Sequence, residues 1–445
     1  MTPKINASPT KEFFISILVR DVKLNAAIAD LVDNCVDGAL RVRPDGNYEG
    51  LKVTLNFNPE SFSIEDNCGG IPAETAINYA FRFGRPSDMP KTLGSVGQFG
   101  VGMKRSLFKI GSFFNIVSIS ENSDFILEID VDDWRSKLGP DGKELWEFEF
   151  TQLNLDTSHD AANWGTSITV TKLHDEIAVE FGYENFRLRL IDDLKNKHEE
   201  SLTKGLEIEV NGFTLAHDEA KLISGFSIKP IKIVRNIDLP GKPVIRVEIY
   251  AGIVKDSDPE QSGWYVSCNG RLILRADKTR VTGWDEQYEN VKIPKAHGQF
   301  ARFRGYLRFT CDDADLLPWN TTKSEINEES NVYQAIKPEM ILAMRQVIDF
   351  LNKLDSELDS DDRLLTDAVR SSAEVKLSSI SERAKFDFPT PPTTPPKPKV
   401  RTISYQMPSE RVERAMELLN ASTLKEVGTE TFDYFMRMED DESAE

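Results

Sequence analysis

The order of apolar and polar positions along the chain predicts an α+β protein. Between residues 11 and 200, helical segments alternate with strands, and the strands that we expect are Ser112–Ile119, Phe125–Val131, Trp146–Phe150 and Ser167–Leu173. This order fits an α/β sandwich in which helices cover one face of a mixed sheet. A polar, helix-like stretch from Glu176 to Glu200 ends this first domain.

A second, strand-rich domain is expected over residues 205–330. Its predicted strands are Phe226–Val234, Val244–Val254, Trp264–Cys268, Arg271–Leu274 and Phe303–Thr310. Asn269 and Gly270 are a typical hairpin-turn pair between two of these apolar runs.

The remaining residues are expected to form helices and a linker. Apolar positions at helical spacing predict a helical segment over residues 331–387, which bends near Ser356–Asp362 and resumes over Leu364–Ser381. Residues 388–400 are rich in proline and form an extended linker. Residues 401–445 follow as a helical tail, over Pro408–Leu419 and Leu424–Met438, with an acidic end. We expect this tail to be a docking element.

One predicted helix, which starts near Leu24, carries a polar face of one chemical kind. Asp30, Asp33, Asn34 and Asp37 recur there at i, i+3, i+4 and i+7. Asp and Asn are weak helix formers, and carboxylates four positions apart repel each other. Carboxylates beside an amide suit a hard cation and a polarised water. An ordinary amphipathic surface helix is the alternative that these residues alone leave open.

Asp66 follows a predicted hairpin over Phe57–Ile64 and enters a loop that contains Gly69 and Gly70. A carboxylate at a strand end can accept a hydrogen bond from an exocyclic amine, and adjacent glycines let a flat ring approach the backbone. A simple Asx turn is the alternative.

A glycine-rich segment precedes another predicted helix and reads Gly94-Ser-Val-Gly-Gln-Phe-Gly-Val-Gly-Met-Lys104. Glycines at this spacing leave backbone N–H groups free to bind an anion at a helix start, and Lys104 adds a cation. The segment is not a Walker A loop, because Met103 separates Lys104 from the last glycine, and it lacks the G-x-G-x-x-G register. It is therefore a phosphate loop of another kind or a flexible loop.

Composition narrows the class of protein. The 445 residues are 40% hydrophobic and 29% charged, and no apolar run approaches the length of a membrane span, so we expect no membrane partner. Four scattered cysteines and five histidines form no zinc motif and suit a reducing cytoplasm. The net charge of −19 argues against a surface that binds nucleic acid throughout.

One segment is locally basic. Its five cations lie within seventeen residues and are Lys292, Lys295, Arg302, Arg304 and Arg308. They either form a local nucleic-acid face on a strand or pair with nearby acidic residues.

Three motifs have now been described: the polar helix face from Asp30 to Asp37, the loop that begins at Asp66, and the glycine-rich segment from Gly94 to Lys104. In this order they resemble the motifs of the GHKL superfamily of ATPases, which includes type II topoisomerases, MutL proteins and MORC proteins. The resemblance implies a Bergerat-type α/β sandwich that binds ATP together with Mg²⁺. It implies that Asp30 is the general base, that Asn34 is the Mg²⁺ ligand and that Asp66 binds the adenine amine. Gly70 belongs to the segment that is similar to the adenine motif, and Thr166 lies in a Gly-Thr pair similar to the fourth motif, behind the adenine.

The glycine-rich segment is similar to the lid of that superfamily, which wraps the triphosphate. The lid residues that the resemblance assigns to ATP are Gly94, Gly97, Gln98, Phe99, Gly100, Val101, Gly102 and Lys104. Two positions depart from the family pattern. Asp30 stands where Glu is usual, and its shorter side chain would slow hydrolysis by misplacing the water. Cys68 stands where the adenine motif usually has Gly, although Gly69 follows it.

The second domain looks like the transducer domain of MutL and MORC proteins. Leu317–Ile326 is similar to the MORC segment whose lysine contacts the γ-phosphate, which implies that role for Lys323. The resemblance implies a Mg²⁺-dependent ATPase that acts as an ATP-gated homodimeric clamp, with DNA or a protein as client, in a DNA-related or defence process. A chaperone-like ATPase that remodels proteins, and a nucleotide-binding switch with little hydrolysis, are the alternatives.

Overall fold

The computed structural model describes residues 9–20, 22–84, 93–97, 102–216, 219–357, 363–389 and 403–442. The chain divides into two compact units, residues 1–390 and residues 391–445. The first unit contains two large sheets. We call residues 9–216 the first region and residues 219–389 the second region.

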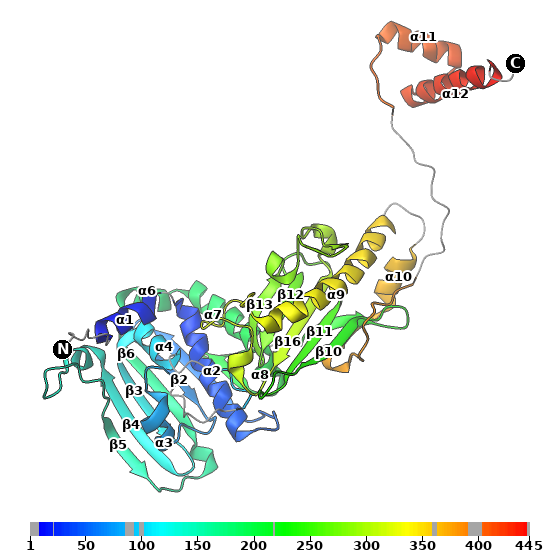
Figure 1. The fold of residues 1–445 in the computed structure, drawn as a ribbon. Coiled ribbons are helices and arrows are strands. Elements are labelled where there is room, and N and C mark those ends of the chain that lie inside the picture. The colour runs from blue at the N-terminus through cyan, green and yellow to red at the C-terminus, as the bar shows by residue number, and fades with distance from the viewer. Residues whose placement is uncertain are drawn as a thin grey trace, which may run out of the picture. The chain divides into compact units, whose positions relative to one another are not determined.

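The first region is built on an eight-stranded mixed sheet (Figure 1). In spatial order the strands are β5 (Phe150–Leu155), β4 (Ser123–Asp130), β3 (Gly111–Ile119), β6 (Gly165–Leu173), β2 (Ser61–Asp66), β1 (Lys52–Asn58), β7 (Glu207–Val210) and β8 (Phe213–Thr214). Neighbouring strands are antiparallel except β1 and β7, which are parallel. Burial alternates along β1, β2, β4 and β6, because one face of the sheet packs against helices.

Three of the helices, α1, α2 and α4, lie across one face of this sheet (Figure 1). The helices of the region are α1 (Lys11–Arg20), α2 (Leu24–Val42), α3 (Ala73–Thr75), the π-helical turn η1 (Ala76–Ala80), α4 (Gly102–Ile110), α5 (Val131–Ser136), the 3₁₀ turn η2 (Ala161–Asn163), α6 (Asp175–Phe181), α7 (Glu184–Lys197) and α8 (Glu199–Thr203). α2 buries an apolar stripe that includes Ile28, Leu31 and Val32 in the same core as the sheet, and α4 packs against it. The predicted mixed α+β architecture is therefore confirmed.

Several element boundaries differ from the sequence-based expectation. The strand predicted over Trp146–Phe150 is wrong, because the strand begins at Phe150. Trp146 and Phe148 instead pack against Trp134 in an aromatic cluster, so ring contacts hold this segment. The stretch predicted as one helix is three helices, with breaks at Gly182 and His198. Strands β7 and β8 belong to the first sheet, although they lie beyond the expected end of the first domain.

The second region contains a five-stranded sheet. Its strands, in spatial order, are β10 (Ile231–Ile237), β11 (Ile245–Ile253), β16 (Phe303–Thr310), β12 (Gly263–Cys268) and β13 (Arg271–Asp277), and only β12 and β16 are parallel. There are also two small antiparallel pairs. One joins β14 (Gln287–Tyr288) to β15 (Val291–Lys292), and the other joins β9 (Lys221–Ser224) to β17 (Ala373–Lys376). The helices are α9 (Asn331–Ser356) and α10 (Leu364–Ser371), with 3₁₀ turns η3 (Arg280–Thr282), η4 (Gly298–Phe300), η5 (Ala314–Leu316) and η7 (Leu377–Ser379).

α9 packs its predicted apolar stripe into a core shared with this sheet. Most predicted strands of the region are present, but the first begins at Ile231, and Phe226 is fully exposed. The prediction that a helix continues from Leu364 to Ser381 is wrong beyond Ser371, because the next residues form β17 and complete the ladder of β9.

The basic segment does not present all of its cations to solvent. Arg304 is buried and donates hydrogen bonds to the carbonyl oxygens of Ala301 and Phe303. Arg302 is half-buried, and its guanidinium lies 3.4 Å from the Val254 carbonyl oxygen. Two of the five cations, Arg302 and Arg304, therefore already have backbone carbonyl oxygens as hydrogen-bond partners.

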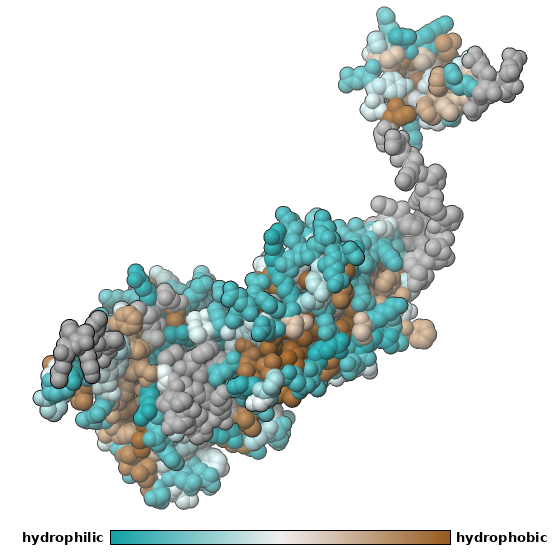
Figure 2. Space-filling model, in the orientation of Figure 1, coloured by the Kyte–Doolittle hydropathy of each residue, from teal (hydrophilic) through white to brown (hydrophobic). Residues whose placement is uncertain are grey.

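The second unit consists of α11 (Ser409–Leu419) and α12 (Leu424–Glu442), in agreement with the two predicted tail helices. Apolar side chains such as Leu418, Phe432 and Phe435 are exposed on this unit, and Figure 2 shows brown and tan residues among the polar ones there. Residues 390–402, most of the predicted linker, and residues 358–362 lie outside the described residues. None of the helices in the described ranges is both long enough and apolar enough to cross a bilayer.

Candidate functional site

Helix α2 carries the four polar residues of the predicted stripe, and three of them are engaged by other parts of the protein. Asp30 is buried, and its Oδ2 accepts a hydrogen bond of 2.6 Å from the Arg105 guanidinium. Its Oδ1 lies 3.7 Å from Nζ of Lys323. The first turn of α4 lies against the same carboxylate, since a methyl group at Gly102 would be 3.7 Å from Oδ2. Asp30 therefore contacts both the start of α4 and the second region.

Asp33 joins the two regions through a buried charge cluster. Its carboxylate lies 2.7 Å from Lys323 Nζ, 3.0 Å from His198 Nε2 and 3.3 Å from an Arg271 guanidinium nitrogen. Burial alone would raise the pKa of Asp33, but the charges of Arg271 and Lys323 and the His198 hydrogen bond hold that pKa well below its usual range. Burial lowers the pKa of His198, although its hydrogen bond to Asp33 opposes that shift.

Lys323 reaches this cluster from a turn between β16 and α9. Its backbone has a φ of 51°, in the left-handed region, and its N–H donates to the Asn320 carbonyl oxygen at 3.0 Å. Burial lowers the pKa of Lys323, but Asp33 and Asp30 outweigh that effect and raise it overall. The ammonium is thus charged and held beside both carboxylates of α2.

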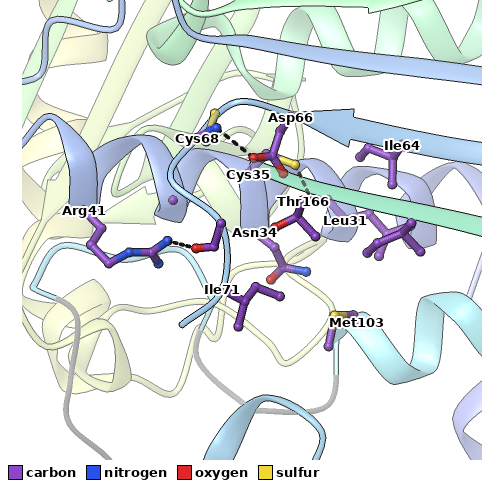
Figure 3. A pocket seen from close by; sticks show the side chains of 13 residues that line it. Leu31, Asn34, Cys35, Arg41, Ile64, Asp66, Cys68, Ile71, Met103 and Thr166 are labelled. Carbon is purple, nitrogen blue, oxygen red and sulfur yellow. Dashed lines mark hydrogen bonds between the residues drawn. The ribbon is translucent and has the colours of Figure 1, made fainter. Parts of the chain in front are cut away.

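Asn34 faces a small cavity together with the residues of the predicted adenine motif (Figure 3). The lining residues are Leu31, Asn34, Cys35, Gly38, Arg41, Ile64, Asp66, Cys68, Gly70, Ile71, Met103, Thr166 and Ile168. They come from α2, β2, the following loop, α4 and β6. Asn34 is exposed to this space, and within the described part of the chain its amide has no hydrogen bond. The cavity therefore combines an exposed amide with a half-buried carboxylate and apolar walls, which is the composition of a small-molecule site.

Asp66 lies at the end of β2, where its carboxylate accepts a hydrogen bond of 2.8 Å from the Cys68 N–H. Burial raises the pKa of Asp66. Thr166 lies opposite Asp66 in the β2–β6 ladder, and its hydroxyl lies 3.2 Å from that of Ser118.

Gly70 is required by the loop that follows. Its φ is +63°, and a methyl group there would lie 2.0 Å from the Ile119 carbonyl oxygen. Its own carbonyl accepts a hydrogen bond from Arg41. Gly69 also has a positive φ, of +92°, so the loop has the conformational freedom that Cys68 does not provide.

The described part of the glycine-rich segment is bound to the protein itself. The N–H groups of Val96 and Gly97 donate to the two carboxylate oxygens of Asp37, both at 2.6 Å. Burial raises the pKa of Asp37 to about 6, although these two hydrogen bonds oppose the shift. The Gly94 N–H lies 3.2 Å from the Asp312 carbonyl oxygen, in the second region. Gln98, Phe99, Gly100 and Val101 lie outside the described residues.

Lys104 is not among the residues that line the cavity. The side chain is buried, and Nζ donates to the Ala80 carbonyl oxygen at 2.7 Å. Burial lowers the pKa of Lys104 to about 7. Met103, the preceding residue, lines the cavity instead.

Three residues of the charge cluster, Arg105, Arg271 and His198, were not predicted from the sequence. Arg105 directly follows the lid residue Lys104, and Arg271 directly follows the Asn269-Gly270 turn, so each stands next to a quoted motif. His198, the partner of Asp33, has no comparable sequence motif beside it, because it lies in a stretch whose pattern predicts only a polar helix.

The donor chemistry decides how a metal ion could be held. Among the described residues, no group of three or more His, Cys, Asp or Glu side chains could hold an ion. The carboxylates of Asp30, Asp33 and Asp37 are all engaged by cations or N–H groups. The amide oxygen of Asn34 remains, since it has no hydrogen bond within the described ranges. Mg²⁺ binds proteins through few protein ligands and takes phosphate oxygens and waters for the rest, so Asn34 fits such an ion only alongside a phosphate ligand.

Comparison with known families supports a nucleotide-binding site in the first region. Residues 22–159 match the family model described as histidine kinase-, DNA gyrase B- and HSP90-like ATPase. The match supports placing this part of the chain in the GHKL superfamily, and with it ATP binding. It includes Asp30, Asn34, Asp66 and the glycine-rich segment, but neither Thr166 nor Lys323. A comparison with curated proteins found no match.

Proposed function

We propose that the first region binds ATP with Mg²⁺ and hydrolyses ATP to ADP and phosphate. The observation that carries this proposal is the shared cavity of Asn34 and Asp66, with Asp30 one helical turn from Asn34 at the start of α4. In this arrangement the Asp66 carboxylate accepts a hydrogen bond from the exocyclic amine of adenine. Gly70 lets the ring approach the loop, and Thr166 lies behind it.

The phosphates would extend from this cavity along α2 toward the first turn of α4. Asn34 would hold Mg²⁺, and bound Mg²⁺ neutralises phosphate charge and orients the phosphate oxygens. The lid segment from Gly94 to Lys104 would cover the triphosphate, which requires Gly97 to exchange its Asp37 contact for phosphate. Lys323, already beside Asp30, would contact the γ-phosphate.

Hydrolysis would then proceed in one displacement. A water oxygen forms a bond to the γ-phosphorus while the bond from that phosphorus to the bridging oxygen of ADP breaks. Asp30 takes the proton from the water. Because Asp30 has one methylene fewer than Glu, we expect slow turnover.

Calorimetry with ATP and Mg²⁺ tests binding. Wild type should bind, and Asp66→Asn should bind about tenfold more weakly or worse, because it loses an acceptor for the adenine amine. Glu65→Gln, an exposed neighbour on β2, is the matched control and should bind like wild type. Absence of binding to the wild-type protein would refute the proposal.

A nucleotide-binding switch with little hydrolysis is the second candidate. It is favoured by the contacts of Asp30, whose two oxygens face Arg105 and Lys323, because both cations compete with a water for this carboxylate. Single-turnover hydrolysis by wild type and Asp30→Asn separates the two functions. A rate that falls in the variant supports the ATPase, and equal, negligible rates support the switch.

We also propose that ATP closes the protein as a homodimeric clamp around a DNA or protein client, as the family resemblance implies. Sizing the full chain with and without a non-hydrolysable ATP analogue should give a monomer-to-dimer shift. Duplex DNA titrated at low and moderate salt should raise the ATPase rate if DNA is the client. The burial of Arg304 removes one cation from the predicted basic face, so a protein client is the alternative.

A further inference from the structure

Arg105 is a buried cation beside Asp30 for which the proposed hydrolysis has no use. It lies in the first turn of α4, and its side chain is 9% exposed. One guanidinium nitrogen is 2.6 Å from Asp30 Oδ2, whereas Nε is buried without a hydrogen-bond partner among the described residues. An arginine placed only to neutralise Asp30 would leave a buried donor unsatisfied, which is costly.

Two buried cations meet at the Asp30 carboxylate. An Arg105 guanidinium nitrogen lies 2.6 Å from Oδ2, and Lys323 Nζ lies 3.7 Å from Oδ1. A ligand that brings negative charge beside this carboxylate would be attracted by both cations.

The position of Arg105 identifies where that ligand would be. Arg105 and Lys323 approach the Asp30 carboxylate through its two different oxygens, so they flank the carboxylate that the proposed function gives to the attacking water. A terminal phosphate next to that water would lie within reach of both cations. Guanidinium groups bind phosphate oxygens through paired N–H donors, and Nε is one of those donors.

We propose that Arg105 is a γ-phosphate-binding residue that Asp30 holds in place until ATP enters. ATP then exchanges the Asp30 contact of Arg105 for a phosphate contact, which frees Asp30 Oδ2 for the water. This inference rests on the proposed function, because it requires ATP in the cavity. It adds a specificity determinant, since a cation at the γ-phosphate favours ATP over ADP.

The test is the ratio of the affinities of the full chain for a non-hydrolysable ATP analogue and for ADP, measured by calorimetry with Mg²⁺. Arg105→Gln should weaken binding of the analogue about 10- to 100-fold, the range of a lost charge-assisted hydrogen bond, and leave ADP binding within about twofold. Lys109→Gln removes a charge from the same helix and should leave the ratio unchanged. Equal effects of Arg105→Gln on both nucleotides would overturn the proposal, because they indicate a structural role.

A second pair of variants separates phosphate binding from simple neutralisation of Asp30. In an Asp30→Asn background there is no carboxylate left to repel the γ-phosphate. The double variant Asp30→Asn/Arg105→Gln removes both members of the buried ion pair, so neither charge is left unpaired and the protein should still fold. If Arg105 binds phosphate, the double variant still loses discrimination relative to Asp30→Asn. An unchanged ratio overturns the inference while the proposed function stands, whereas failure of the wild-type protein to bind either nucleotide overturns both.

Discussion

Replacing Lys104 with Met should remove a pH dependence from the folding stability of this protein. The ammonium is buried against the Ala80 carbonyl oxygen, and burial lowers its pKa from 10.5 to about 7. Between pH 7 and pH 10.5 the unfolded chain keeps a proton on Lys104 that the folded protein has lost. The free energy of unfolding therefore rises with pH across this window.

The magnitude follows from the size of the pKa shift. Each pH unit in the window contributes up to about 1.4 kcal/mol, and less near pH 7, where the folded group is half-titrated. From pH 7 to pH 9 the Lys104 contribution to the unfolding free energy should thus rise by about 2 kcal/mol. Met keeps the side-chain bulk and has no proton to lose, so the stability advantage of Lys104→Met over wild type should shrink by that amount.

Urea unfolding at pH 7, 8 and 9, followed by circular dichroism, measures the difference directly. Comparing variant with wild type at each pH cancels the other titrating groups. Lys109→Met, half-buried on the same helix, is the control, and its difference from wild type should stay flat. A Lys104→Met difference that is equally flat would refute the buried, proton-losing state of Lys104.

Three other changes have defined expectations. Asp33→Asn leaves buried cations unpaired and should lower the free energy of unfolding by about 3–5 kcal/mol in urea. If Asp33→Asn costs the same in a Lys323→Met background, the coupling between Asp33 and Lys323 is contradicted. Gly70→Ala combines a positive φ with a backbone clash and should cost more than about 2 kcal/mol, whereas Gly50→Ala, with a φ of +82° and open space, measures the strain alone. Asp37, whose folded pKa is about 6, keeps a proton between pH 4 and pH 6 that the unfolded chain loses, so stability should fall by up to about 3 kcal/mol as pH rises through that range, and Asp37→Asn should abolish this fall.

Local pattern was enough to predict many of the elements and the motif helices. The apolar stripe of α2, the hairpin of β1 and β2 and the long helix α9 are all determined by neighbours within a few residues, so periodicity detects them. The segment at Trp146 failed because its apolar residues pack ring against ring and do not join a ladder. β17 was missed because the strand that it pairs with, β9, is distant in sequence.

In the candidate site, too, local motifs could be predicted from the sequence, whereas contacts between distant residues could not. Sequence could indicate Asp30, Asn34 and Asp66, because each belongs to a motif whose spacing has a chemical reason. It could not show that Asp30 meets Arg105 or that Asp33 meets His198, since partners that are 75 and 165 residues apart in the chain are selected by tertiary packing. Nor could it show that Lys104 turns to the Ala80 carbonyl oxygen.

The contact between Asp33 and Lys323 has a practical consequence for anyone who wishes to cut the chain. These two side chains are separated by 290 residues, yet the carboxylate of one is buried against the ammonium of the other. A fragment that stops after the first sheet would retain an acid with its main counterions deleted, and would be expected to fold poorly or to bury that acid protonated. Domain dissection should therefore keep residue 323 and everything before it together.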